Sequence, residues 1–403
     1  MTTLRRLAST TGGAGFPHAE QGHESGDLPF IKVSDFNHAG NERVITTCNN
    51  WVTKETARRL RATVVPSGSV LLPKVGAALL GNARRIVRQP SVFDNNILGV
   101  VPEKISSRYL HYWLTTVDAV QFAKPGPVPS MDDSAILNLR VPVVRQHEQR
   151  AIADYLDTET NHIDTLITKK RRMIELLERR LRITARELTT RSGATGPLRR
   201  FVRRVKTGTT PPASELGDLH GSDVAWYSPG DVGPSLRMYP PARSLTLRAL
   251  SEGWTPEFPT DSTLIVGIGA TAGHVGHNFS RSTGNQQMTC ITPNVRILPK
   301  FLSWQLWARS DELRETAPYT TLPILNNEFL RSTLIVVPSL TSQEAVVDQL
   351  DRSADRLLAT AKGLGIQIGL LLERRQSLIT QAVMGELAAP SLTKAAFREP
   401  QSP

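Results

Sequence analysis

The sequence predicts an α+β protein formed by tandem duplication, in which a mixed α/β lobe followed by a long helix occurs twice. The two helices are expected to pair as an antiparallel coiled coil. Three observations predict this fold class. Residues 156–188 and 350–382 place mainly apolar side chains at alternating intervals of four and three, which is a heptad seam. Each seam begins at a Leu-Asp pair seven residues after a glutamine, and each contains Leu-Leu-Glu-Arg-Arg. Short motifs ahead of the helices also recur in the same order, about 194 residues apart.

The seams determine which side chains we expect between the two helices. A helix over residues 148–190 would be about 63 Å long at 1.5 Å per residue, and solvent cannot satisfy an apolar stripe of that length. We therefore expect the two copies to pair within the chain, antiparallel if the lobes lie at opposite ends. Gly363, Gly365 and Gly369 weaken the second helix and are expected to permit a close backbone approach or a bend. The expected helix-pairing residues are Leu156, Ile163, Ile167, Ile174, Leu177, Leu181, Leu350, Leu357, Leu364, Ile368, Leu371 and Leu378.

The same patterns divide the chain into five segments. The linker Ser-Gly-Ala-Thr-Gly-Pro at 192–197 ends the first helix, because glycine and proline do not continue it. The expected segments are a first mixed lobe at 1–141, a central helical region at 142–196, a second lobe at 197–337, a C-terminal helical region at 338–390 and a flexible tail at 391–403.

The motifs that recur in both lobes are short, and the residues between them differ. Leu-Arg-Arg at 4–6 and Thr-Gly at 11–12 correspond to Leu-Arg-Arg at 198–200 and Thr-Gly at 207–208. The bend at 75–81 corresponds to 268–273, and Asp-Asn-Asn at 94–96 corresponds to Asn-Gln-Gln at 285–287. This pattern indicates one scaffold that carries two divergent surfaces, within residues 28–141 and 224–337.

Composition and charge are typical of a globular protein with a polyanionic partner. A length of 403 residues suggests two or three domains. Residues 1–141 carry 16 basic and 11 acidic side chains and residues 197–337 carry 14 and 11, so the lobes hold +8 of the net charge of +11. Basic lobes suit a polyanion such as DNA, although a basic surface kept for solubility gives the same charge.

Cysteine usage and hydropathy indicate the compartment. Cys48 and Cys290 are too few for a disulfide framework or a cysteine-rich zinc site. No apolar run is long enough to span a bilayer, and no secretory signal follows Met1. We therefore expect a protein of a reducing cytoplasm.

No catalytic signature is visible in the sequence. It lacks a phosphate loop, an H-E-x-x-H motif and a G-x-S-x-G motif. Residues 267–272 approximate a dinucleotide-binding pattern, but no ribose-binding acidic residue at the end of a βαβ unit follows. The Asn/Asp-Pro-Pro-aromatic motif with which amino-methyltransferases hold a flipped base is also absent. We therefore expect no catalytic residue and no metal site.

The duplicated plan resembles the DNA-specificity subunit of type I restriction–modification systems, from about residue 4 to 387. The lead-in from Glu148-Gln149 to Leu156-Asp157 is similar to the family's helix start. The second copy keeps Gln343 and Leu350-Asp351 but has Ser342 where the family usually has an acid. Residues 371–385 resemble the family's helix end, and residues 268–273 and 284–287 match the scaffold of its recognition domains.

This resemblance implies a function and a set of partners. Each lobe would be a target recognition domain that reads one half of a bipartite, asymmetric DNA target, mainly from the major groove. The helices would set the spacer and dock two methyltransferase (modification) subunits and the restriction (translocase/nuclease) subunits, in a phage-defence system of the prokaryotic cytoplasm. S-adenosylmethionine, ATP and Mg²⁺ would be bound by those partner subunits, and no cofactor by this chain.

Polar residues beside the recurring motifs are candidates for two kinds of DNA contact. Asparagine and glutamine pair bidentately with adenine, and serine and threonine bond to any base. The base-reading candidates are Ser34, Asn95, Asn96, Thr209, Ser228, Gln286 and Gln287. Cations beside loops can clamp phosphates, and these candidates are Lys32, Lys74, Lys124, Arg203, Arg204 and Lys206. The Asn-Gln-Gln segment at 285–287 is equally consistent with a scaffold turn.

Two other functions fit parts of the sequence. A coiled-coil scaffold that assembles protein partners would have the same helices but would bind duplex DNA without site preference and only at low salt. An enzyme with an unrecognised site would show methyl transfer or hydrolysis by the chain alone.

Overall fold

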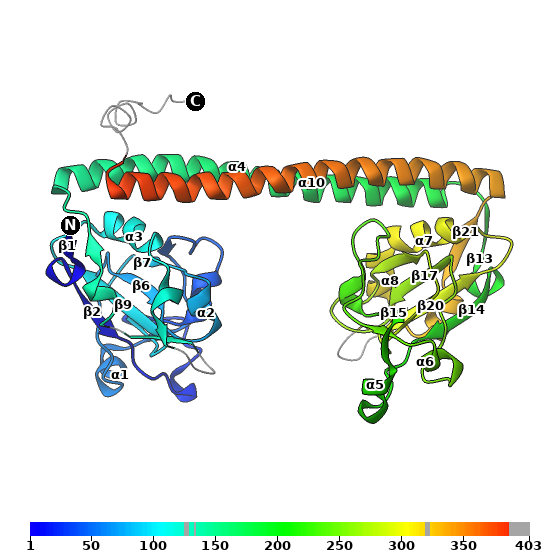
Figure 1. Cartoon of the computed structure of the whole chain (residues 1–403), viewed down its shortest axis with the longest axis horizontal. Coiled ribbons are helices and arrows are strands. Elements are labelled where there is room, and N and C mark those ends of the chain that lie inside the picture. The colour runs from blue at the N-terminus through cyan, green and yellow to red at the C-terminus, as the bar shows by residue number, and fades with distance from the viewer. Residues whose placement is uncertain (125–128, 133, 319–322, 387–403) are drawn as a thin grey trace. The chain divides into compact units, whose positions relative to one another are not determined.

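The computed structural model describes residues 1–124, 129–132, 134–318 and 323–386 (Figure 1). It forms two compact units, Met1–Lys169 with Gln367–Pro403, and Lys170–Ile366. Each unit contains one lobe and part of each long helix, so the compact units cut across the five predicted segments. The predicted tail at 391–403 lies outside the described residues. In the part of the chain that is described, no helix is long and apolar enough to cross a membrane.

The lobe of the first unit is built on a five-stranded sheet in the order β2-β9-β6-β7-β4. Neighbouring strands are antiparallel, except that β4 and β7 are parallel. All four residues of β6 and the first four of β9 are buried, as expected for central strands that are covered on both faces. The strands are β2 (Ala8–Gly12), β4 (Val44–Ile45), β6 (Val70–Pro73), β7 (Arg85–Val87) and β9 (Ile97–Pro102).

Shorter ladders complete this lobe. A three-stranded sheet has the order β5-β3-β8, in which β3 is antiparallel to β5 and parallel to β8. The two ends of the lobe meet in the β1–β12 pair, and β10 pairs with β11. These strands are β1 (Thr2–Thr3), β3 (Leu28–Ile31), β5 (Trp51–Val52), β8 (Val92–Phe93), β10 (Ala123–Lys124), β11 (Ser130–Met131) and β12 (Arg140–Val141).

The lobe of the second unit repeats this topology, except that an isolated parallel bridge from Leu236 to Gly276 of β18 stands where the first lobe has strand β4. Its main sheet has the order β14-β20-β17-β18, its smaller sheet the order β16-β15-β19, and its ends meet in the β13–β21 pair. Strand directions also match, because β15 is antiparallel to β16 and parallel to β19. The strands are β13 (Ala194–Pro197), β14 (Val202–Thr207), β15 (His220–Tyr227), β16 (Ser244–Leu245), β17 (Ser262–Val266), β18 (Val275–Asn278), β19 (Ser282–Gly284), β20 (Met288–Pro293) and β21 (Leu334–Val337).

Short helices connect and cover these sheets. The α-helices of the first lobe are α1 (Lys54–Arg59), α2 (Ala77–Leu80) and α3 (Ser107–Thr115). Those of the second are α5 (Ala213–Leu219), α6 (Arg248–Ser251), α7 (Pro299–Ala308), α8 (Ser310–Thr316) and α9 (Asn327–Ser332). Single turns of 3₁₀ helix lie at Leu4–Arg6, His18–Glu20, Val33–Asn37, Ala119–Phe122, Ile136–Asn138, Leu198–Arg200 and Pro229–Asp231.

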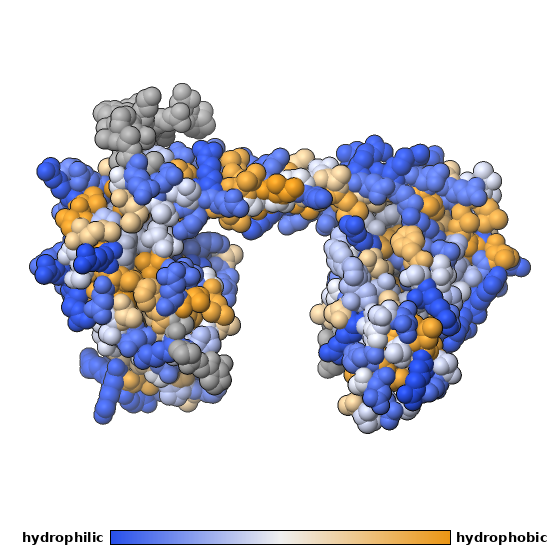
Figure 2. All heavy atoms as spheres, in the orientation of Figure 1, coloured by the Kyte–Doolittle hydropathy of each residue, from blue (hydrophilic) through white to orange (hydrophobic). Residues whose placement is uncertain are grey.

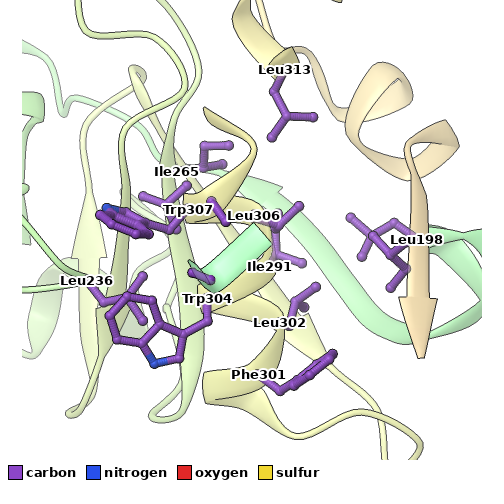
Figure 3. Close-up of a cluster of buried hydrophobic side chains, with 14 of the residues drawn as sticks. Leu198, Leu236, Ile265, Ile291, Phe301, Leu302, Trp304, Leu306, Trp307 and Leu313 are labelled. Atoms are coloured by element: carbon purple, nitrogen blue, oxygen red, sulfur yellow. The ribbon is translucent and has the colours of Figure 1, made fainter. Parts of the chain in front are cut away.

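The core of the second lobe lies between helix α7 and the main sheet. Figure 3 shows Phe301, Leu302 and Trp304 of this helix gathered with Ile265 and Ile291 of the strands. All five side chains are at most 1% exposed, and burial of one such side chain contributes roughly 2 kcal/mol. This packing holds the main sheet of the second lobe against helix α7. The loops at the end of the sheet away from the long helices are therefore attached to a well-packed core.

The long helices α4 (Gln146–Thr190) and α10 (Leu340–Met384) pair antiparallel. In the first unit the start of α4 packs against the end of α10, because Leu156 lies in one core with Ile379 and Val383. In the second unit the end of α4 packs against the start of α10, because Leu181 lies in one core with Leu350. The predicted fold class is therefore confirmed.

The seam positions face inward along both helices, and none of the expected helix-pairing residues is exposed. Six are buried, namely Leu156, Ile163, Ile167, Leu181, Leu350 and Leu357. The other six are half-buried, namely Ile174, Leu177, Leu364, Ile368, Leu371 and Leu378. The heptad spacing thus marks the inward face of each helix within its unit.

The recurring glutamine fixes each long helix to its lobe. In the first unit the amide oxygen of Gln149 accepts a hydrogen bond from Ser106 N at 2.7 Å, and its Nε2 donates to Val144 O at 2.8 Å. In the second unit Gln343 makes the same two bonds, with Leu298 N at 2.7 Å and Pro338 O at 2.9 Å. Both glutamines are nearly inaccessible to solvent.

The aspartate of the recurring Leu-Asp pair also links each long helix to its lobe, farther along the helix than the glutamine. The Asp157 carboxylate accepts hydrogen bonds from Tyr112 Oη at 2.7 Å and from Arg108 at 2.8 Å, both on α3. The Asp351 carboxylate accepts from Lys300 Nζ at 2.7 Å and Trp304 Nε1 at 3.0 Å, both on α7. The two motifs recur at the same spacing because both make the contacts that hold each long helix against its lobe.

Two sequence-based expectations are wrong. Gly363, Gly365 and Gly369 do not permit a close approach, because a Cβ at each would meet no atom within 4 Å, and α10 continues unbroken through them. The first-lobe counterpart of Gly208 is Gly13 rather than Gly12. A Cβ would lie 2.0 Å from Asp94 O at Gly13 and 2.0 Å from Gly284 O at Gly208, so both positions require glycine.

Candidate DNA-binding surfaces

Backbone hydrogen bonds gather four loops at one end of the first lobe. Ala14 N donates to Phe93 O at 2.9 Å, Asp94 N to Ile31 O at 3.0 Å and Lys74 N to Asn96 O at 2.8 Å. Strand β9 leads away from this end toward Ser106, which contacts the long helix. We call it the loop end of the first lobe, and Figure 1 shows it on the side of the lobe away from α4 and α10.

The loop end carries the base-reading candidates of the first lobe. Ser34 lies in the 3₁₀ turn that follows β3, and its side chain is exposed. Asn95 is exposed and Asn96 half-buried in the turn between β8 and β9. The structure therefore brings these three candidates to one surface; their contact with bases stays a prediction.

The three lysines of the first lobe that are candidates for phosphate contacts are partly buried or already have partners within the protein. Lys32 Nζ donates to Gln21 Oε1 at 2.9 Å, and Lys74 is half-buried. Lys124 Nζ lies 3.3 Å from the Asp132 carboxylate. Hydrogen bonds from Ser134, and then Lys124, hold the pKa of Asp132 below its ordinary value, so this carboxylate remains a charged partner for Lys124.

The loop end of the second lobe is assembled by the same bonds. Thr209 N donates to Gly284 O at 3.0 Å, Asn285 N to Tyr227 O at 3.0 Å and Gly267 N to Gln287 O at 2.7 Å. Strand β20 leads from this end to the segment that contacts Gln343. The candidates Thr209, Ser228, Gln286 and Gln287 therefore lie together.

These second-lobe candidates differ in how free their side chains are. Thr209 and Gln286 are exposed, whereas Ser228 and Gln287 are half-buried. Ser228 Oγ donates to the Asp231 carboxylate at 2.8 Å, and Ser228 N donates to the same oxygen at 2.7 Å. Ser228 thus stabilises its own turn. Gln286 is more exposed, although its Oε1 accepts a hydrogen bond from Thr210 Oγ1, and contact of either residue with a base stays a prediction.

The turn that joins the smaller sheet to the main sheet is a scaffold element in both lobes. Asn96 N donates to Asp94 Oδ1 at 2.7 Å, and Gln287 N donates to Asn285 Oδ1 at 2.9 Å. Such bonds are typical of Asx turns. The central residues, Asn95 and Gln286, project outward, so a common turn presents a different side chain in each lobe.

The cationic candidates of the second lobe follow the edge strand β14. Arg203, Arg204 and Lys206 are all exposed there. Lys206 is the nearest to the loop end, and Arg203 is about 10 Å farther along the strand at 3.3 Å per residue. The structure therefore brings only Lys206 close to the base-reading candidates.

Sequence reasoning missed Arg243, which lies at the loop end of the second lobe. It lines a cavity of about 180 Å³ together with Trp226, Ser228, Asp231 and Asn285. No motif marks this arginine, because it precedes the two-residue strand β16 in a segment without a recurring pattern. The pairing of β15 with β16 brings Arg243 to the loop end.

The hydropathy of the surface agrees with a polar binding face. Figure 2 shows mainly hydrophilic residues on the loop ends of both lobes, with a smaller hydrophobic patch on the second. Within the described residues, no group of three or more His, Cys, Asp or Glu side chains could hold a metal ion. The loop ends thus offer hydrogen-bonding and cationic groups.

A comparison with known sequences matches most of the second lobe and the first part of the helix α10. A family model described as the type I restriction modification DNA specificity domain matches residues 202–368. The chain is also 24% identical over 168 residues to the type I restriction enzyme EcoR124I/EcoR124II specificity subunit of Escherichia coli. That match covers 40% of this chain and 41% of the relative, so the chain aligns with about two fifths of the relative's length.

One solved structure extends the likeness in fold to nearly the whole chain. A chain from a study of complex assembly and conformational transition of the type I R-M system covers 96% of this chain and 97% of its own length, with a TM-score of 0.69 and 14% identity. The HsdS subunit from Thermoanaerobacter tengcongensis covers 96% of each chain at a TM-score of 0.45 and 15% identity. The first of these shows the same fold. Residues 202–368 are thus similar to a type I restriction modification DNA specificity domain, and the matched part of the chain is similar to a type I restriction enzyme specificity subunit.

Proposed function

We propose that this chain is the sequence-specific DNA-binding subunit of a type I restriction–modification complex. Each lobe reads one half of a bipartite, asymmetric target, and the paired helices set the unread spacer between the halves. The observation that carries this proposal is the repetition of one scaffold with two different loop ends. A scaffold that only assembled proteins would have no need for two sets of outward polar side chains on identical turns.

The electrostatics of the lobes support DNA as the ligand. The two lobes hold +8 of the net charge of +11, and exposed cations follow the edge strand β14. Cations supply the sequence-independent part of DNA affinity, while amides and arginines in the major groove supply discrimination between bases. Exposed Asn95 and Gln286 are suited to adenine, which offers a paired donor and acceptor.

The long helices support docking of partner subunits. Apolar side chains outside the seam remain exposed on α4 and α10, including Met173, Leu176 and Ile183 in the second unit and Leu370 and Leu372 in the first. Exposed apolar groups that cluster are typical of protein interfaces. We assign these faces to two methyltransferase subunits and to restriction subunits, which would bind S-adenosylmethionine, ATP and Mg²⁺. This chain would contribute recognition and assembly rather than catalysis.

The proposal is tested by selecting DNA from a random duplex library with the full chain, co-expressed with the methyltransferase subunits of the proposed complex. The expected result is two short, unlike conserved blocks separated by a spacer of fixed length and no sequence preference. Binding should weaken with salt while the blocks persist at physiological ionic strength. DNA binding without any conserved block would favour the assembly-scaffold function instead.

A further inference from the structure

One backbone position of the smaller sheet carries different side chains in the two lobes. Phe30 N donates to Asn50 O at 2.8 Å in the first lobe, and Trp226 N donates to Arg243 O at 3.3 Å in the second. In each case the acceptor immediately precedes the two-residue strand β5 or β16. Asn50 and Arg243 are therefore structural counterparts.

The first lobe uses this position to hold its own chain together. Asn50 is 6% exposed, and its Oδ1 accepts a hydrogen bond from Gly22 N at 2.9 Å. The side chain of Arg243, by contrast, is exposed and has neither a hydrogen bond nor an ion pair with any described residue. The scaffold thus does not need an arginine here, and the guanidinium is free for a ligand.

The surroundings of Arg243 place it among the base-reading candidates. It lines the same cavity as Ser228 and Asn285, and Asn285 begins the turn that projects Gln286 outward. The nearby Asp231 carboxylate already accepts two hydrogen bonds from Ser228 and makes no ion pair with Arg243 within 4.0 Å. The N–H donors of the Arg243 guanidinium are therefore unpaired within the described residues and lie at the loop end.

We propose that Arg243 is a specificity-determining residue of the second lobe and that it contacts a guanine of the second half-site. This inference rests on the proposed function and adds to it a residue and the base that it reads. A guanidinium donates two parallel hydrogen bonds to O6 and N7 of guanine, which is the commonest specific contact in the major groove. A lysine carries the same charge but lacks the planar fork.

A phosphate contact is the alternative role for an exposed arginine, and it makes a different prediction. Loss of a phosphate contact weakens binding to all sequences alike and reduces the salt dependence. Loss of a guanine contact relaxes selection at one base pair. Arg243→Lys separates the two roles because it preserves charge while removing the bidentate geometry.

The test compares base preferences of the wild-type chain and of Arg243→Lys and Arg243→Asn, each in the full chain with its methyltransferase subunits. Arg243→Asn introduces the residue that the first lobe carries at this position. Arg296→Ala is the matched control, because Arg296 is also exposed in the second lobe and its side chain makes no described hydrogen bond or ion pair. Preference at every position is measured by selection from a random library, and overall affinity by titration of non-specific duplex.

Both Arg243 variants are expected to lose at least tenfold in preference for guanine at one position of the second block, with the first block unchanged. Arg243→Lys should keep wild-type affinity for non-specific duplex, and Arg296→Ala should keep both blocks. Unchanged preference in Arg243→Lys, or a uniform loss of affinity without a change in preference, would overturn the inference while leaving the proposed function intact. A wild-type chain that selects no block would remove both proposals.

Discussion

The two halves of the chain have a glycine, a glutamine and an aspartate at corresponding positions of the scaffold. They differ in the side chains that their loop ends expose. Gly13 and Gly208 allow the same backbone crossing, and Gln149 and Gln343 make the same pair of bonds. On that frame the first lobe presents Asn95 and the second presents Gln286. The residues that hold the fold together are thus the same in both lobes, whereas the side chains that point outward differ.

A buried histidine makes a corresponding helix–strand contact in each lobe, although it stands on the helix in one lobe and on the strand in the other. In the first lobe His111 of α3 lies 3.3 Å from Arg84 O, just before β7. In the second lobe His277 of β18 lies 2.9 Å from Ser303 Oγ of α7. Each lobe thus links the same helix to the same strand by one buried histidine, supplied from opposite sides.

The largest loss of stability is expected at Gly13 and Gly208, where the chain passes directly against the backbone carbonyl of a neighbouring segment. Gly13→Ala and Gly208→Ala each place a Cβ 2.0 Å from a carbonyl oxygen, so the backbone must move, at a cost of about 3 kcal/mol or more. Gly15→Ala is the control, because its Cβ would meet no atom within 4 Å. Chemical denaturation measures all three. A large effect in one lobe and none in the other would break the equivalence of the two crossings.

The second-largest loss of stability is expected at Gln149 and Gln343, near the starts of the two long helices. Gln149→Ala leaves Ser106 N and Val144 O without their partner, and Gln343→Ala does the same to Leu298 N and Pro338 O. A buried polar group without a partner costs roughly 1–3 kcal/mol, so each variant should lose about 2 kcal/mol of unfolding free energy. Replacement of exposed Gln146 by alanine should change little. Unequal losses from the two glutamines would show that the helices dock differently.

The buried histidine of the first lobe gives a pH dependence that the structure explains. Burial, and then the charge of Arg43, lower the pKa of His111 to about 3, whereas a histidine of the unfolded chain titrates near pH ~6.5. Between these values the unfolded chain binds one more proton, so stability falls as pH falls below about 6.5. From pH 7 to pH 5 this group alone should remove about 2 kcal/mol.

His111→Gln tests this prediction, because glutamine can still donate to Arg84 O but does not titrate. The difference in unfolding free energy between pH 7 and pH 5 should shrink by about 2 kcal/mol relative to wild type. All other titrating groups are common to the two proteins and cancel in the comparison. Equal pH slopes would mean that His111 is accessible to protons in the folded state.

The smallest effects are expected in α10, where the two long helices differ in glycine content. Alanine at Gly363, Gly365 or Gly369 would meet no atom within 4 Å, and each substitution should stabilise the helix by up to about 1 kcal/mol. Gly385→Ala should act in the opposite direction, because Gly385 has a φ of +78°, which L side chains rarely adopt. Thermal unfolding of the four variants checks the signs. Destabilisation at residues 363–369 would contradict the open surroundings of these glycines and indicate close packing against another part of the chain.

The sequence was informative wherever a periodic or repeated pattern reflects a structural need. The heptad spacing predicted the inward faces of α4 and α10, and the repeated Gln and Leu-Asp motifs correspond to docking contacts. Arg243 could not be predicted, because its place at the loop end depends on the pairing of β15 with a two-residue strand. The role of Ser228 also required coordinates, since only the structure shows its hydroxyl bonded to Asp231.

If each lobe reads its own half-site, replacement of residues 198–333 by a second copy of residues 4–139 should change the selected DNA in a defined way. The two ranges are of equal length, and each is closed at its neck by an equivalent bond, from Leu4 N to Leu139 O and from Leu198 N to Thr333 O. DNA selected by this chain with its methyltransferase subunits is expected to contain the first block twice and the second block not at all. Selection of the original two unlike blocks would contradict this expectation.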